Sequence, residues 1–163
     1  MSAAPHLSEL VGRVDELARI DAAIAAVVAG GSRALVLSGE PGIGKTALLS
    51  AARSRAAGAG VHVVHGRAAE QEEDVPFGLV VDALDDEAAT LAGPDLGRLR
   101  PLLGTVLPGL AQQDAATAAA PGDAPVARVA IHRALRDLVD VVAAGRPVAL
   151  LLDDLHWADE ASL

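Results

Sequence analysis

One stretch decides the fold of this 163-residue chain: Gly39-Glu40-Pro41-Gly42-Ile43-Gly44-Lys45-Thr46. It matches the GxxxxGK[ST] pattern of a phosphate loop, in which glycines let successive backbone N–H groups point inward around a phosphate. A short apolar run, residues 34–37, precedes the loop and predicts a strand covered on both faces. Residues 45–57 follow without glycine or proline and predict a helix. Together they predict a site for a nucleoside triphosphate.

The side chains of the loop have distinct expected roles. Lys45 would reach the β- and γ-phosphate oxygens, and the Thr46 hydroxyl would occupy one coordination position of a magnesium ion. Lys45 is also the only lysine among thirteen basic residues. A compact ammonium fits between phosphate oxygens, whereas a planar guanidinium does not. The residues expected to contact the nucleotide are Gly39, Glu40, Pro41, Gly42, Ile43, Gly44, Lys45, Thr46 and Ala47.

A second motif lies near the end of the chain, where the apolar run 148–152 leads into Asp153 and Asp154. This is the Walker B pattern, a buried strand that delivers carboxylates to the edge where open α/β sheets bind ligands. We expect Asp153 to hold the magnesium ion and Asp154 to polarise an attacking water. The alternative is a strand end with two solvated acids. Aspartate is one methylene shorter than glutamate, so slow hydrolysis is our hypothesis.

The remaining patterns complete an alternation of helices and strands. Residues 13–29 have apolar side chains at helical spacing, and residues 61–65 are β-branched and short. Further helices are predicted near 77–91, 96–107 and 126–144, with a surface loop at 108–125. This order predicts an α/β fold of three layers around a parallel sheet. We divide it into an N-terminal segment, 1–32, and a P-loop core, 33–163.

Composition excludes several classes of protein. The net charge of −9 repels phosphate backbones, and the two aromatic residues, Phe77 and Trp157, provide no stacking platform for nucleic acid. There is no cysteine, no signal-like N-terminus and no apolar run long enough to cross a membrane. We therefore expect a cytoplasmic protein with no membrane partner.

Other polar residues favour structural roles. His62 and His65 are three positions apart on a strand, so their rings should point to opposite faces and share no metal. Asp159 and Glu160 are expected in the first turn of a helix, where carboxylates are favoured. Trp157 is expected to pack. We interpret the acidic cluster at 70–74 as a solvated turn, because its spacing is not that of a calcium loop.

Three segments together resemble a known family: Leu10-Val11-Gly12-Arg13, the phosphate loop, and the run from Leu150 to Asp159, which contains Asp-Asp-Leu-His-Trp-Ala-Asp. They are similar to the STAND branch of the AAA+ (ASCE-type) P-loop ATPases, and within it to the N-terminal ATPase of large LuxR-type, MalT-like transcriptional regulators. The resemblance covers nearly the whole chain. It implies ATP as the nucleotide, and it implies that Val11, Gly12 and Arg13 lie near the base.

The resemblance also implies segments that would follow Leu163: a further strand, sensor and lid elements, and a DNA-binding domain. We therefore expect an incomplete fold at the C-terminus, self-association when ATP is bound, and DNA contact only through that later domain. An AAA+ ATPase of the origin-recognition type, acting on DNA, is compatible with the same motifs. So is a nucleotide-binding module without turnover. A small-molecule kinase is disfavoured, because no basic cluster follows the loop to bind a second phosphate.

Overall fold

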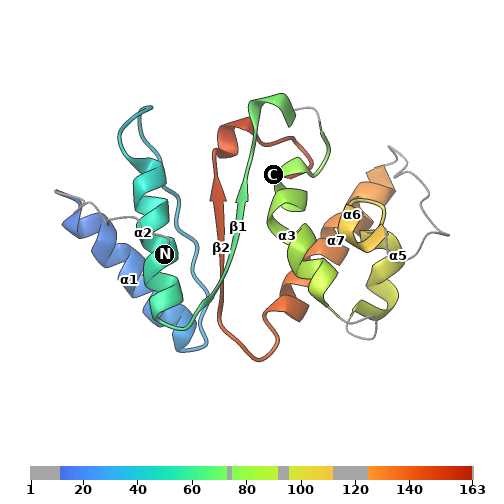
Figure 1. Cartoon of the computed structure of the whole chain (residues 1–163), viewed down its shortest axis with the longest axis horizontal. Helices are drawn as coiled ribbons and strands as arrows, with labels where there is room; N and C mark the ends of the chain where they lie inside the picture. The colour runs from blue at the N-terminus through green and yellow to red at the C-terminus, as the bar shows by residue number, and fades with distance from the viewer. Residues whose placement is uncertain (1–11, 73–74, 92–95, 112–124, 163) are drawn as a thin grey trace, which may run out of the picture. The chain divides into compact units, whose positions relative to one another are not determined.

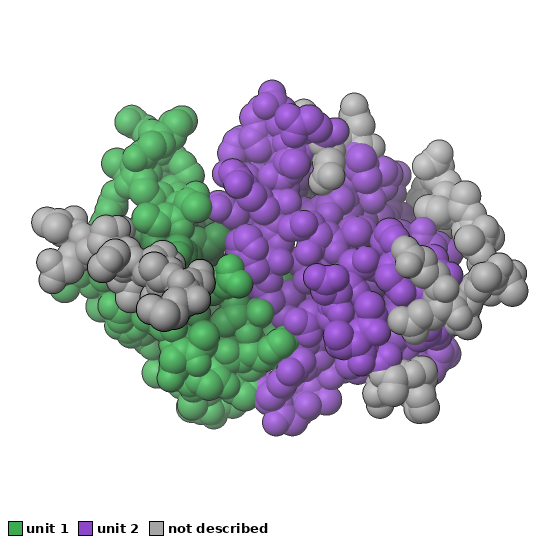
Figure 2. Space-filling model, in the orientation of Figure 1, with its two compact units in different colours: residues 1–63, 147–151 green, residues 64–146, 152–163 purple. Residues whose placement is uncertain are grey.

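The structure is a computed structural model that describes residues 12–72, 75–91, 96–111 and 125–162, with the side chains of residues 72 and 125–127 left out. The chain forms two compact units. Unit 1 comprises residues 1–63 and 147–151, and unit 2 comprises residues 64–146 and 152–163 (Figure 2).

The described residues form two helices, a strand, a series of helices, a second strand and a final 3-10 helix, in that order (Figure 1). The α-helices are α1 (Val14–Val28), α2 (Lys45–Gly58), α3 (Gly78–Thr90), α5 (Arg100–Leu103), α6 (Pro108–Ala111) and α7 (Pro125–Val142). The strands are β1 (His62–Arg67) and β2 (Val148–Asp153), and the 3-10 helices are η1 (Glu70–Glu72), η2 (Gly97–Leu99) and η3 (Leu155–Trp157). No helix in these ranges is long and apolar enough to cross a membrane.

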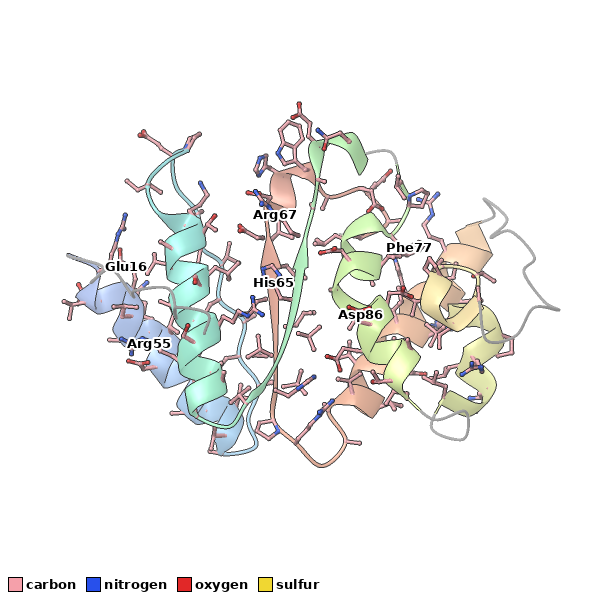
Figure 3. All side chains as sticks on the ribbon, in the orientation of Figure 1. Glu16, Arg55, His65, Arg67, Phe77 and Asp86 are labelled. Atoms are coloured by element: carbon pink, nitrogen blue, oxygen red, sulfur yellow. The ribbon has the colours of Figure 1, made fainter. Side chains whose placement is uncertain are left out.

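Unit 1 is built on the packing of α1 against α2 (Figure 1). Its core consists of Ile20 from α1 with Leu48 and Ala52 from α2, all nearly inaccessible to solvent. On the outside of the pair, the Arg55 guanidinium donates to both carboxylate oxygens of Asp21, at 2.7 and 2.6 Å (Figure 3). Both helices were predicted from apolar spacing and composition, and both predictions are confirmed to within one or two residues.

The prediction of a strand at residues 34–37 is wrong. These residues have no regular secondary structure, and Val36 is 82% exposed and Leu35 50% exposed. Only Leu37 packs, against the core that Ile20 and Leu48 form. A strand is stabilised by ladder hydrogen bonds and cross-strand side-chain pairs. No segment in the described ranges pairs with 34–37, so apolar composition alone does not make it a strand.

The two strands that do form are parallel and hydrogen-bonded to each other. The N–H of His62 donates to the carbonyl of Pro147 at 2.9 Å, and the N–H of Ala68 donates to the carbonyl of Asp153 at 3.2 Å. This confirms the strands predicted at 61–65 and 148–152, each extended at its C-terminal end. The prediction that strand 148–152 is buried on both faces is wrong, because Leu150 is 42% exposed. The carboxyl ends of parallel strands meet at one edge, so Arg67 and Asp153 end their strands side by side.

Unit 2 depends on a close approach between α3 and β1. A Cβ atom on Gly66 would lie 2.6 Å from the Cβ of Ala83 and 3.0 Å from the carbonyl oxygen of Leu79. Glycine is therefore required at this position of the strand. Elsewhere α3 contacts α6, and α5 contacts α7. The largest fully buried side chains of the unit are Leu79, Leu96, Leu103, Leu107, Leu110 and Leu138.

The outer helices of unit 2 differ in part from expectation. The helix predicted at 126–144 is confirmed as α7, and that at 77–91 is confirmed as α3. The patch predicted at 96–107 is broken into η2 and α5. The predicted loop at 108–125 is wrong at its start, where α6 forms, and residues 112–124 lie outside the described ranges.

Candidate nucleotide-binding site

The phosphate loop connects the irregular segment 34–38 to the first residue of α2. Gly42 and Gly44 have φ angles of +79° and +98°, in the left-handed region that only glycine adopts at little cost. A Cβ atom on either would meet nothing within 4 Å. The backbone conformation, and not contact with neighbouring protein atoms, therefore requires glycine at these positions.

Lys45 closes the loop onto itself. Its ammonium donates to the carbonyl oxygens of Gly39 at 3.0 Å and Glu40 at 3.1 Å. An ammonium carries three donors and binds anions as a point charge. A phosphate group that entered the loop would offer oxygens with more negative charge than these carbonyls. The one lysine of the chain is thus placed where its ammonium can exchange these carbonyl partners for the oxygens of a bound phosphate.

The start of α2 adds to this anion site. The first turn of an α-helix has backbone N–H groups with no partner inside the helix. Here these belong to Lys45, Thr46 and Ala47, because the first helical bond runs from the N–H of Leu48 to the carbonyl of Gly44 at 3.0 Å. Together with the positive end of the helix dipole, they favour a phosphate at this position. Thr46 is exposed beside them.

Arg13 links the start of α1 to the loop. Its guanidinium donates to the carbonyl oxygen of Ile43 at 2.6 Å and to the carboxylate of Glu16 at 2.7 Å (Figure 3). The bond from Arg13 also lowers the pKa of Glu16, so this carboxylate remains charged. Sequence reasoning put Arg13 near the nucleotide but did not foresee its bond to the loop backbone.

A cavity of about 290 Å³ lies between α1, the segment 35–38 and the loop, entirely within unit 1. Its charged lining consists of three cations, Arg13, Arg19 and Lys45, and one acid, Glu16. Ile20 and Leu48 supply part of its apolar wall. This is the combination that a nucleotide requires: cations for the phosphates and apolar surface for the base. Of the three residues expected near the base, Gly12 and Arg13 are described, and Val11 lies outside the described residues.

The acidic pair at the end of β2 belongs to unit 2. Asp153 is 9% exposed, and its Oδ1 accepts the N–H of Asp154 at 2.9 Å. Asp154 has a φ angle of +55°, a left-handed conformation that is uncommon outside glycine. The two carboxylates therefore differ: that of Asp153 is buried and bonded to the backbone, and that of Asp154 belongs to a residue with a strained backbone.

Arg67 lies at the end of β1 (Figure 3) and forms an ion pair with the carboxylate of Asp154. Its Nε donates to the Oδ2 atom of Asp154 at 2.8 Å, and its Nη2 forms an ion pair with the same oxygen at 2.7 Å. The hydrogen bond that Arg67 donates to Asp154, together with the negative charge of that carboxylate, raises the pKa of Arg67. Sequence reasoning missed this residue. The parallel pairing of two strands that end in Arg67 and Asp153 would have indicated it, because such ends share one edge.

The prediction that Asp159 lies in the first turn of a helix is wrong. This residue precedes a short turn, is 7% exposed, and accepts the N–H groups of Ala161 and Ser162. Trp157 is partly buried in η3, with its ring 4.9 Å from that of His156.

The predicted magnesium ligands suit that ion by chemistry. Mg²⁺ prefers oxygen donors, and a threonine hydroxyl with a carboxylate is such a set. Thr46 lies in unit 1 and Asp153 in unit 2. Within the described ranges, no group of three or more histidine or acidic residues could hold a metal ion by itself.

The glycine loop, its lysine and the helix that follows define a P-loop domain that binds nucleoside triphosphates. Comparison with protein families identifies the particular kind: residues 9–163 match the family described as AAA ATPase domain, and the chain belongs to it. The domain is therefore an ATP-binding domain of the AAA ATPases. Searches of curated proteins and of solved structures give no match.

Proposed function

We propose that this domain binds ATP with magnesium in the cavity of unit 1 and hydrolyses it slowly. The observation that carries the proposal is the loop itself, in which Lys45 is held by the carbonyls of Gly39 and Glu40 at the positive end of α2. Arg13 stabilises the loop through Ile43 and lines the wall that would face the base.

Each residue has a defined task in this proposal. Lys45 exchanges its carbonyl partners for phosphate oxygens, and the N–H groups of the loop surround the β-phosphate. Thr46 and Asp153 would hold the magnesium ion, which neutralises phosphate charge when bound. Asp154 orients a water through its Oδ1 atom, because Arg67 already occupies Oδ2. The side chain of Asp154 is one methylene shorter than that of a glutamate, so it would align the water less well, which supports slow turnover.

We also propose that the domain works as a signalling switch of the STAND type in a LuxR-like transcriptional regulator. The run from Leu150 to Asp159 and the Val-Gly-Arg segment at 11–13 support this finer assignment. In such a switch, ATP with magnesium favours a closed, self-associating state, and hydrolysis resets it. DNA contact would belong to a separate domain.

Replacement of Lys45 by alanine tests the central claim. A hydrogen bond to a charged group contributes about 1.5–3 kcal/mol, so ATP should bind about 10- to 100-fold more weakly to Lys45→Ala. Isothermal titration calorimetry, with and without magnesium, measures this. Arg33→Ala is the matched control, because it removes one positive charge from an exposed residue whose bond goes to the neighbouring Ser32. Equal ATP affinity in wild type and Lys45→Ala would refute the proposal.

A further inference from the structure

A buried carboxylate ties the residues after β2 to the start of α3. The Oδ1 atom of Asp159 accepts the N–H groups of Phe77 and Ala161 at 2.9 Å each and that of Ser162 at 3.0 Å. Its Oδ2 atom accepts the hydroxyl of Ser162. Ser162 and Ala161 are close in sequence, but Phe77 is 82 residues away. Asp159 is thus a tertiary anchor and not only a local cap.

The chemistry of Asp159 keeps this anchor charged. Burial raises its pKa, but the hydrogen bonds from Ser162, Phe77 and Ala161 together hold the pKa below its ordinary value. Hydrogen bonds to an ionised acceptor are about twice as strong as neutral ones. The carboxylate is therefore fixed in one position by four donors from two parts of unit 2.

Unit 2 contains two residues with a strained backbone, and one of them, Phe77, belongs to this contact. Phe77 and Asp154 have φ angles of +65° and +55°, and they are the two non-glycine residues with positive φ in the described ranges. Such conformations cost on the order of 1 kcal/mol or more and persist where the surroundings hold them. Asp159 holds the backbone of Phe77, whose ring also meets that of His132 edge to face at 5.4 Å. Arg67 holds Asp154.

The contacts close into a circuit within unit 2. From Asp159 the circuit passes to Phe77 at the start of α3. Five residues further along α3, the Oδ2 atom of Asp82 accepts the N–H of Arg67 at 2.7 Å. The side chain of Arg67 then holds Asp154, and η3 leads from Asp154 back to Asp159. A displacement of the Asp154 carboxylate would act on its bond to Arg67, and the backbone of Arg67 is bonded to Asp82 on α3. His132 reinforces the circuit from α7, since its Nε2 donates to the carbonyl of Ala161 at 2.6 Å.

We propose that Asp159 is a positioning residue for Asp154, and that it couples the acidic end of β2 to helix α3. The inference rests on the proposed function in one respect: the Asp153–Asp154 pair must respond to bound ATP and magnesium. Under that condition, α3 and η3 move together with Asp154. The sequence places a reporter inside the circuit, because Trp157 lies between Asp154 and Asp159 and is the one tryptophan of the chain.

Fluorescence of Trp157 on the complete chain tests the coupling. ATP is added first, and magnesium is then titrated into the ATP complex while ATP affinity is measured by calorimetry. Wild type should give a magnesium-dependent change in emission. Asp159→Ala should lose most of this change and keep its ATP affinity, because the phosphate loop lies in unit 1. Where hydrolysis is measurable, kcat should fall about 10- to 100-fold with KM retained, as expected when a reacting group is displaced.

Conservative and control variants separate position from charge. Asp159→Asn should keep the response, because the amide oxygen can still accept the three N–H groups that now bond to Oδ1. Glu160→Ala, an exposed acid next in sequence, should behave as wild type. If Asp159→Ala does not fold, Ser162→Ala removes only the hydroxyl contact and should reduce the response in part.

The outcomes distinguish the two proposals. Wild type that binds no ATP would refute the proposed function. Wild type that binds ATP without a change at Trp157 would refute the coupling alone. A full response in Asp159→Ala would refute it as well, as would an equal loss in Asp159→Asn, because the effect would then follow charge and not position. If Asp159→Ala does not fold, a full response in Ser162→Ala would refute the positioning role.

Discussion

Gly44 is the residue on which the loop turns into α2, with a φ angle of +98° and open space where a Cβ would lie. Gly44→Ala should therefore lower the free energy of unfolding by about 1–2 kcal/mol, since an L side chain disfavours the left-handed region. Urea unfolding measures the change. It should also weaken ATP binding, because the loop N–H groups lose their inward direction.

Gly58→Ala is the matched control for Gly44→Ala. Gly58 is the last residue of α2, and a Cβ there also meets nothing within 4 Å. Its backbone is helical, so alanine should stabilise the chain by about 0.5–1 kcal/mol. Opposite signs for the two substitutions are the expected result. Equal effects would mean that the conformation of Gly44 is not what requires glycine.

At the scale of single residues, sequence reasoning found the loop but not the arginines that organise it. Lys45 and its neighbours follow from a local pattern that carries its own mechanism. The bond from Arg13 to Ile43 spans 30 residues, and that from Arg67 to Asp154 spans 87. No local pattern indicates which distant segments lie side by side, so partners of this kind require the fold.

Among the elements, the contact between β1 and α3 is the tightest that a substitution can probe. Gly66→Ala would bring a methyl group to 2.6 Å from the Cβ of Ala83 and should cost about 1–3 kcal/mol of stability, as overpacking does. Thermal or urea unfolding measures the loss. Ala83→Gly in the same chain should restore part of it, because it removes the nearest atom.

The double variant decides the cause of that loss. Coupled neighbours give non-additive changes in the free energy of unfolding, whereas independent sites give additive ones. If Gly66→Ala costs as much in the Ala83→Gly background as in the wild-type background, steric contact between β1 and α3 is not the reason that residue 66 is glycine.

The elements also show where sequence reasoning reaches its limit. Helices such as α1 and α2 were predicted because their apolar spacing and composition are local properties. Segment 34–37 has the composition of a strand but not the partner that a strand needs. The break between η2 and α5 was missed for a related reason, since tertiary packing overrides a weak helical preference.

For the whole molecule, acid stability should depend measurably on Asp159. The native pKa of Asp159 is lowered, so the unfolded chain binds this proton more tightly than the folded one. The resulting stability is fully present above the unfolded pKa of an aspartate, about 3.9, and is lost as pH falls through the lower native value. Wild type should therefore be more stable than Asp159→Asn at neutral pH, and the difference should shrink below about pH 4.

Urea unfolding of both chains at stepped pH gives this difference directly. The contributions of the other acidic residues to the free energy of unfolding cancel in this difference, because wild type and variant share these residues. A difference that stays constant into acid, or grows, would contradict a lowered native pKa. At this scale the sequence indicated the AAA ATPase family through three segments, 10–13, 39–46 and 150–159, and the match over residues 9–163 confirms that family. The finer STAND assignment stays a prediction. The two compact units, whose boundaries fall within β1 and β2, follow from no local pattern.

The single lysine of the chain has a chemical consequence beyond nucleotide binding. Apart from the α-amino group, Lys45 is the one amine that acylating reagents or acetyl donors can reach, and in the structure it is held against the carbonyls of Gly39 and Glu40. Acylation would turn its ammonium into a neutral amide. Any such covalent mark on a side-chain amine would fall on the phosphate loop and on nothing else.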